Sequence, residues 1–191
     1  MLPLHQIPNA VTLGRIVLIA PIVWLLAEEQ YLLAIPLLAL AGLSDALDGW
    51  LVRRYQWHTK LGAWLDPTAD KLLMLGTYAA VTLSGLLPAW LFFVVVGRDI
   101  WLTAGSLLYR VWVGPLTIRP LLISKVNTLL QIALVLVAIA QVGPVALDPI
   151  WVRLLILAVA LTTLVSGLAY TIQWGVYAWR HLHGRSGNAT R

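Results

Sequence analysis

The sequence predicts an all-α polytopic membrane protein with six transmembrane helices and a short N-terminal interfacial segment. Two observations support this class. Hydrophobic residues make up 60% of the 191 positions and charged residues only 11%, and the mean hydropathy is +0.85. Soluble domains are far more polar. Cysteine is absent, which excludes disulfides and thiolate metal ligands. We expect residues 1–191 to form a single domain.

Six apolar runs are each long enough to cross a hydrocarbon core, which takes about 20 helical residues. Residues 1–9 contain two prolines and form the interfacial segment. The N-terminus has no basic region and no small-residue cleavage site, so we expect the first run to be retained as a span. The predicted spans are 11–27, 31–52, 61–87, 88–109, 123–142 and 150–179.

Polar and turn residues mark the ends of these runs in chain order. The first ends at the polar stretch EEQ, the second at two adjacent arginines, and the third at Gly85. Pro88 suits the first turn of the fourth helix, because its missing N–H would be unpaired there in any case. A loop with Gly114, Pro115 and Pro120 precedes the fifth run, and GPVALDP precedes the sixth. A polar tail, HLHGRSGNATR, follows the last span.

Basic residues are concentrated in alternate connections, and positive charge near span ends favours the cytoplasmic side. One side carries Arg53, Arg54, Lys60, Arg110, Arg119, Lys125, Arg180, Arg185 and Arg191. The other side carries Glu28, Glu29, Asp148 and Arg153. We therefore expect both termini to be cytoplasmic, in a bacterial inner membrane. The basic residues are dispersed among these turns, so nucleic-acid binding has no support.

Four of the eight acidic residues lie in one stretch, SDALDGWLVRRYQWHTKLGAWLDPTADK. Asp45 and Asp48 are three apart, and Asp66 and Asp70 are four apart, so each pair lies on one helical face. Two antiparallel helices joined by the basic loop would bring the pairs together at similar depth. Four carboxylates this close need counter-charge, and all-oxygen ligation suits two Mg²⁺ or Mn²⁺ ions.

Each of these residues also has a purely structural interpretation. The aspartates can cap helices or pair with Arg53, Arg54 and Lys71, although four in two facing pairs favour a metal site. Gly49 and Gly62 permit close approach of a helix or ligand, or simply pack. Arg53 suits a phosphate clamp or an interfacial anchor.

The pattern Asp45-Ala-Leu-Asp48-Gly49, then Arg53, Gly62, Asp66 and Asp70, resembles the signature of the CDP-alcohol phosphatidyltransferase family. Val52 stands where the family usually has alanine, and no ligand position departs. The resemblance implies six spans, a homodimer and a two-metal site near the cytoplasmic face that binds a CDP-linked lipid. It makes all four aspartates metal ligands and Asp70 also the general base. Gly49, Arg53 and Gly62 would bind the CDP-lipid.

The N-terminal segment PNAVTLGR is similar to the opening motif of the same family. By that resemblance Asn9, Thr12 and Arg15 help to bind the nucleotide and its phosphates. Without it, Asn9 or Thr12 is a helix cap and Arg15 is an anchor.

The second half should select the acceptor alcohol. Arg98 and Asp99 lie deep in the fourth span, where a charge needs either a functional role or a structural ion pair with another span. Polar groups at the start of the fifth span suit a pocket for a phosphate or hydroxyls, or a snorkelling interface. The candidate acceptor residues are Arg98, Asp99, Arg119, Lys125 and Asn127.

The motifs GRD, SKVNTLLQ and TTLVSGLAY resemble the branch of the family in which phosphatidylglycerol attacks CDP-diacylglycerol to give cardiolipin and CMP. A second branch, which accepts glycerol 3-phosphate, differs from this chain only slightly at the same positions. A small cation transporter with an intramembrane carboxylate site is the alternative from another class. The basic residues beside the cluster suit phosphate, and no inverted repeat relates the two halves, which favours the enzyme.

Overall fold

The structure is a computed structural model that describes residues 7–55, 62–112, 121–142 and 147–186. Across these ranges it contains six α-helices and no strand, which confirms the predicted all-α class. The helices are α1 (Ile7–Ala27), α2 (Tyr31–Tyr55), α3 (Gly62–Leu83), α4 (Ala89–Trp112), α5 (Leu122–Val142) and α6 (Pro149–Ser186).

The predicted spans match these helices to within a few residues at most ends. The largest differences are α1, which begins at Ile7 inside the predicted interfacial segment, and α6, which continues to Ser186. Five helices, all except α3, are long and apolar enough to cross a membrane. In α3, Asp66, Asp70 and Lys71 lie together in the first half and interrupt the apolar run. The sixth span therefore stays a prediction, and its weak point is the acidic pair itself.

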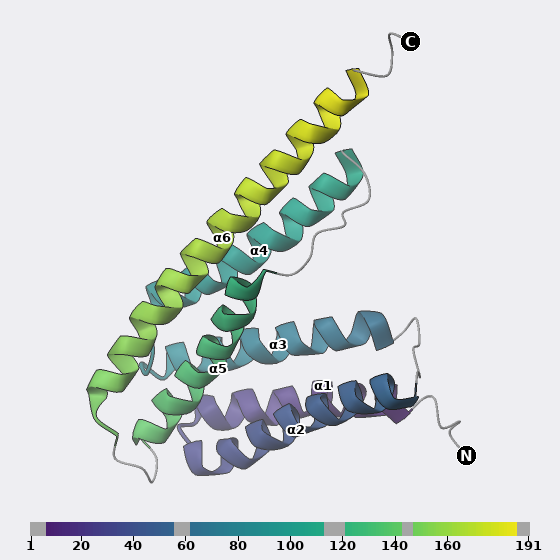
Figure 1. The fold of residues 1–191 in the computed structure, drawn as a ribbon. Coiled ribbons are helices and arrows are strands. Elements are labelled where there is room, and N and C mark those ends of the chain that lie inside the picture. Colours follow the sequence, from purple (N-terminus) through teal and green to yellow (C-terminus); the bar gives the residue numbers. More distant parts are fainter. Residues whose placement is uncertain (1–6, 56–61, 113–120, 143–146, 187–191) are drawn as a thin grey trace. The chain divides into compact units, whose positions relative to one another are not determined.

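The helices divide into two compact units. The first contains α1, α2, α3 and the end of α5 from Val135, and the second contains most of α4, the first part of α5 and α6. In the first unit α1 packs against both α2 and α3 (Figure 1). The order of the connections makes α1 and α3 run opposite to α2. The start of α1, the end of α2 and the start of α3 therefore lie at the same end of this unit.

Two helices of the first unit end in the same hydrogen-bonded motif. At the end of α1, the Gln30 amide donates to the Leu25 carbonyl (2.8 Å), and Glu29 adopts the left-handed conformation with φ 58°. At the end of α3, the Leu86 amide donates to the Val81 carbonyl (3.1 Å), and Gly85 takes φ 78°. This Schellman arrangement pairs carbonyls that a helix end leaves open. Gly85 marks the exit of the third span as predicted.

Small residues allow α1 and α3 to approach closely. A Cβ added at Gly76 in α3 would lie 2.8 Å from Val23 Cγ2 in α1. The Ser84 hydroxyl of the same unit donates to the Leu26 carbonyl (3.0 Å). Ile22 and Leu26 of α1 are fully buried in this core. The close packing holds the start of α1 in register with the acidic residues of α3.

In the second unit α4 and α6 lie side by side through an aromatic contact (Figure 1). A Cβ on Gly105 in α4 would lie 2.1 Å from Trp174 Cζ3 in α6. One turn away, Trp101 Nε1 donates to Thr171 Oγ1 (3.0 Å). The first amide before α5, that of Leu121, donates to the Tyr170 hydroxyl (3.2 Å). Gly105 is therefore required for the approach of α4 to α6.

Gly105→Ala should destabilise the protein, because the new methyl overlaps the Trp174 ring and overpacking costs about 1–3 kcal/mol. Gly97→Ala in the same helix is the matched control, because nothing lies within 4 Å of its added Cβ. Alanine also has the better helix propensity, so the control should be neutral or slightly stabilising. Unfolding in detergent micelles measures both, and equal stability of the two variants would contradict this packing.

Candidate functional site

The candidate site is centred on two side chains of α1, Thr12 and Arg15. They are three residues apart and so lie on one face of the helix. That face is turned toward α2 and α3, because both side chains are buried and bond to aspartates of both helices. The sequence predicted that the aspartate pairs meet. It did not predict that α1 would connect them.

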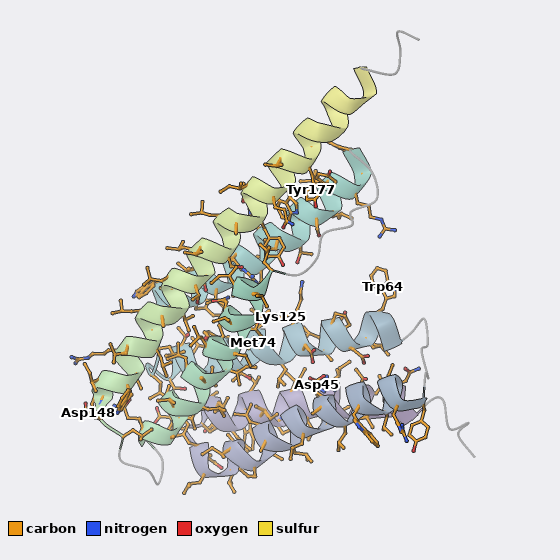
Figure 2. The ribbon with its side chains drawn as sticks, viewed as in Figure 1. Asp45, Trp64, Met74, Lys125, Asp148 and Tyr177 are labelled. Atoms are coloured by element: carbon orange, nitrogen blue, oxygen red, sulfur yellow. The ribbon has the colours of Figure 1, made fainter. Side chains whose placement is uncertain are left out.

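The Arg15 guanidinium contacts three of the four aspartates. Its Nη1 lies 2.8 Å from Asp45 Oδ1 in α2 and 2.7 Å from Asp70 Oδ1 in α3. Its Nη2 pairs with Asp48 Oδ2. One cation thus joins carboxylates from both acidic pairs. Figure 2 shows Asp45 on the side of α2 that faces the neighbouring helices of this unit.

Thr12 brings the fourth aspartate into the cluster. Its Oγ1 lies 2.5 Å from Asp66 Oδ1 and 3.4 Å from Asp48 Oδ2. A hydroxyl has one proton to donate, and the shorter contact directs it to Asp66. Thr12 and Arg15 together therefore link all four carboxylates, as the converging helix ends require.

Exposure differs sharply between members of this cluster. The side chain of Arg15 is 0% exposed and that of Asp48 is 4% exposed, whereas Asp45 and Asp70 are 50% and 52% exposed. Buried charges are stable only when they are paired, and Arg15 and Asp48 supply each other's partner. Asp45 and Asp70 form the accessible side, so a ligand would reach the cluster past them.

The donor set suits a hard divalent cation, since four carboxylates offer only oxygen. Among the described residues, however, no three such groups already stand in a metal-holding arrangement. The Arg15 guanidinium lies between the carboxylates and pairs with them instead. Its Nε is buried and has no hydrogen-bond partner among the described residues, so the arginine itself is incompletely satisfied in this position. The residues therefore fit a metal chemically, provided that Arg15 moves.

The other residues predicted to bind the CDP-lipid lie at the same end of the unit. Asn9 is half-buried one turn before Thr12 in α1, and Gly49 is half-buried directly after Asp48. Gly62 is buried as the first residue of α3. The side chain of Arg53 lies outside the described residues, so its predicted role as a phosphate clamp stays a prediction.

A second polar cluster, in the other unit, surrounds Arg98 of α4. Its Nη2 donates to Ser124 Oγ of α5 (2.7 Å) and to Ser166 Oγ of α6 (2.6 Å). Its Nη1 pairs with Asp99 Oδ1 at 2.8 Å. The expectation that these adjacent charges face apart and need partners on other spans is wrong for the ion pair. The long arginine side chain bends back to its neighbour, and only its hydroxyl partners come from other helices.

Asn127 forms a second link between α5 and α6. Its Oδ1 accepts hydrogen bonds from Thr162 Oγ1 (2.8 Å) and Thr163 Oγ1 (2.9 Å), and the residue is 0% exposed. Its position favours a structural role over direct ligand contact. Lys125, two residues earlier, is exposed, and Asp99 is partly exposed. Arg119 lies outside the described residues.

The signal for the Arg15 contacts was present in the sequence. A single arginine in an apolar run needs a counter-charge, because an unpaired charge in a membrane is costly. The nearest buried carboxylates in a three-helix arrangement are the four aspartates. Assigning Arg15 to the nucleotide overlooked this requirement.

Residues 5–173 match the family described as CDP-alcohol phosphatidyltransferase, and the chain belongs to this family. The match runs across both units. It confirms the resemblance on which the aspartate signature was assigned.

Three relatives illustrate the range of names within the match. The chain is 35% identical over 182 residues to a human protein named cardiolipin synthase (CMP-forming), covering 86% of this chain and 60% of that protein. It is 34% identical to a rice chloroplastic protein named CDP-diacylglycerol--glycerol-3-phosphate 3-phosphatidyltransferase 1 (88% and 57%). It is 32% identical to an Aquifex aeolicus protein with the latter activity in its name (88% and 95%).

Ser166→Ala should destabilise the second unit, because it leaves a guanidinium N–H of Arg98 without its acceptor. An unsatisfied buried donor costs about 1–3 kcal/mol, more when charged. Ser106→Ala is the control, since that hydroxyl bonds only to the Thr103 carbonyl of its own helix. Thermal unfolding in micelles distinguishes them, and a Ser166 variant as stable as the Ser106 variant would argue against the Arg98 cluster.

Proposed function

We propose that this chain transfers a phosphatidyl group from CDP-diacylglycerol to the free hydroxyl of phosphatidylglycerol, giving cardiolipin and CMP. The observation that carries the proposal is the convergence of all four signature aspartates on Thr12 and Arg15. Membership of the family supports phosphatidyl transfer over the alternative of cation transport. The chain spans about 60% of the human relative's length, so its activity is inferred from its own residues as well.

Asp45, Asp48, Asp66 and Asp70 would hold two Mg²⁺ or Mn²⁺ ions, which neutralise the pyrophosphate and stabilise the departing CMP when bound. The family supports metal dependence in general. For this chain, the support is the all-oxygen donor set and the half-exposed Asp45 and Asp70, which leave the cluster accessible.

The reacting atoms define the roles of the remaining groups. The acceptor oxygen forms a bond to the phosphorus that carries diacylglycerol, and the bond from that phosphorus to the CMP oxygen breaks. Asp70, half-exposed at the accessible side, takes the proton of the attacking hydroxyl. Asn9, Thr12, Arg15, Gly49, Arg53 and Gly62 bind the CDP-lipid.

The second unit supplies the acceptor site in this proposal. Lys125 and Asp99 are accessible and suit direct contact with acceptor hydroxyls or phosphate. Arg98 and Asn127 are held by hydroxyls of neighbouring helices, so they would act chiefly by positioning. Arg119 completes the set. We further propose a homodimer in a bacterial inner membrane with the site on the cytoplasmic side.

Phosphatidylglycerophosphate synthesis from glycerol 3-phosphate is the second candidate. The relative from Aquifex aeolicus favours it, because the match covers 95% of that protein. The two reactions share donor, metal site and base. They differ only in the acceptor, so a direct comparison of acceptors separates them.

Asp70→Asn should abolish transfer, because the amide cannot accept the hydroxyl proton; loss of a general base costs about 10²–10⁴-fold in rate. Binding of CDP-diacylglycerol should be largely retained, since three carboxylates remain. Asp148→Asn, at an exposed position before α6, is the control for charge loss. Release of CMP and lipid binding are measured separately, and full turnover by the Asp70 variant would refute the assignment.

Purified protein with CDP-diacylglycerol and Mg²⁺ should release CMP when phosphatidylglycerol is added, and far less with glycerol 3-phosphate. The product should run as cardiolipin in lipid analysis. EDTA should stop the reaction, and added Mn²⁺ or Mg²⁺ should restore it. CMP release with glycerol 3-phosphate alone would instead establish the second candidate, and undiminished activity in chelator would exclude the metal mechanism.

A further inference from the structure

The position of Arg15 is unusual for a phosphate-binding residue. Its side chain is fully buried, and it points into the acidic cluster rather than toward open space. Both terminal nitrogens pair with carboxylates, while Nε has no partner among the described residues. An arginine already committed to three carboxylates cannot also bind a pyrophosphate. The two roles therefore belong to two different states of the site.

The charge of the cluster explains why these states should alternate. Four carboxylates cannot remain ionised together without a cation, and in this structure Arg15 supplies the only basic side chain that is seen in contact with them among the described residues. Two divalent ions would neutralise all four carboxylates without the arginine. The guanidinium would then lie beside a cationic centre, where it is repelled, and anionic phosphates would become its best partner.

We propose that Arg15 is an exchangeable counter-cation: it holds the aspartate cluster in the metal-free protein, and divalent metal displaces it toward the CDP phosphates. This inference rests on the proposed metal-dependent function. Metal binding and nucleotide binding are then linked, because the ion that enters the cluster releases a ligand for the nucleotide. Metal-free protein binds CDP weakly for the same reason.

The exposure pattern indicates where the exchange begins. Nη1 is held by Asp45 and Asp70, which are half-exposed, whereas Nη2 is held by the buried Asp48. An incoming ion meets Asp45 and Asp70 first and competes with Nη1 there. The Asp48 contact breaks last, since solvent does not reach it.

Arg15→Met separates this role from simple structural support, because the expected effects have opposite signs. Without the competing guanidinium, Mn²⁺ should bind the full-length protein in micelles at least tenfold more tightly, as measured by electron paramagnetic resonance of free Mn²⁺. CDP should bind at least tenfold more weakly at saturating Mn²⁺. The melting temperature in EDTA should fall, and Mn²⁺ should raise it by more than in the wild type.

Arg110→Met is the matched control, because it removes one exposed positive charge far along the chain from the cluster; its Mn²⁺ and CDP affinities should equal those of the wild type. If Arg15→Met does not fold, Arg15→Lys tests the same point. A lysine presents one nitrogen instead of a fork, so Mn²⁺ affinity should rise severalfold and CDP affinity should fall.

Unchanged or weaker Mn²⁺ binding in the Arg15 variants, with a wild-type site that binds Mn²⁺, overturns the exchange alone. Asp48→Asn and Asp66→Asn test the site itself and should each weaken Mn²⁺ binding. Wild-type protein that binds no Mn²⁺, or aspartate variants that bind it normally, would overturn both the exchange and the proposed metal site.

Discussion

The first unit depends on the pairing of a buried arginine with carboxylates from two other helices. Neither partner is stable alone in an apolar helix bundle, since an unpaired charge there is costly. Arg15 with Asp45, Asp48 and Asp70 satisfies both sides at once. The pairing also sets the relative positions of three helix segments, because the guanidinium reaches its partners only when the start of α1, the end of α2 and the start of α3 coincide. Stability and function thus use the same side chains.

The second unit applies the same physical rule with a different outcome. Arg98 is likewise placed deep in a helix, but it has one carboxylate and two serine hydroxyls as partners. Hydroxyls satisfy its donors without adding charge, so this cluster has no surplus of negative charge to attract metal. Its polar groups instead tie α4, α5 and α6 together. The exposed groups beside it are those left to recognise an acceptor, which is consistent with relatives that share the donor chemistry and differ in the acceptor named.

Most of the fold could be predicted from the sequence because hydrophobic runs and turn residues are local signals. Gly85 ends α3 where expected, and Pro88 directly precedes α4. The helix ends at Ile7 and Ser186 were missed, because a helix that continues beyond an apolar run leaves no hydropathy signal. The aspartate signature was recognised from spacing alone. The partners of Arg98 were not, because its reach back to Asp99 depends on side-chain conformation rather than on helical position.

The sequence by itself determined the all-α class, the family and the identity of the four acidic residues, because composition and fixed spacing are properties of the chain alone. Only the tertiary structure decided which groups neutralise those residues. Thr12 and Arg15 lie more than thirty positions from Asp48 and more than fifty from Asp66 and Asp70, and only packing of α1 against α2 and α3 brings them into contact. The same holds for Asn127 with Thr162 and Thr163. Hydrogen bonds and ion pairs act over a few ångströms, so a linear pattern shows that a buried charge needs a partner but not which partner it has.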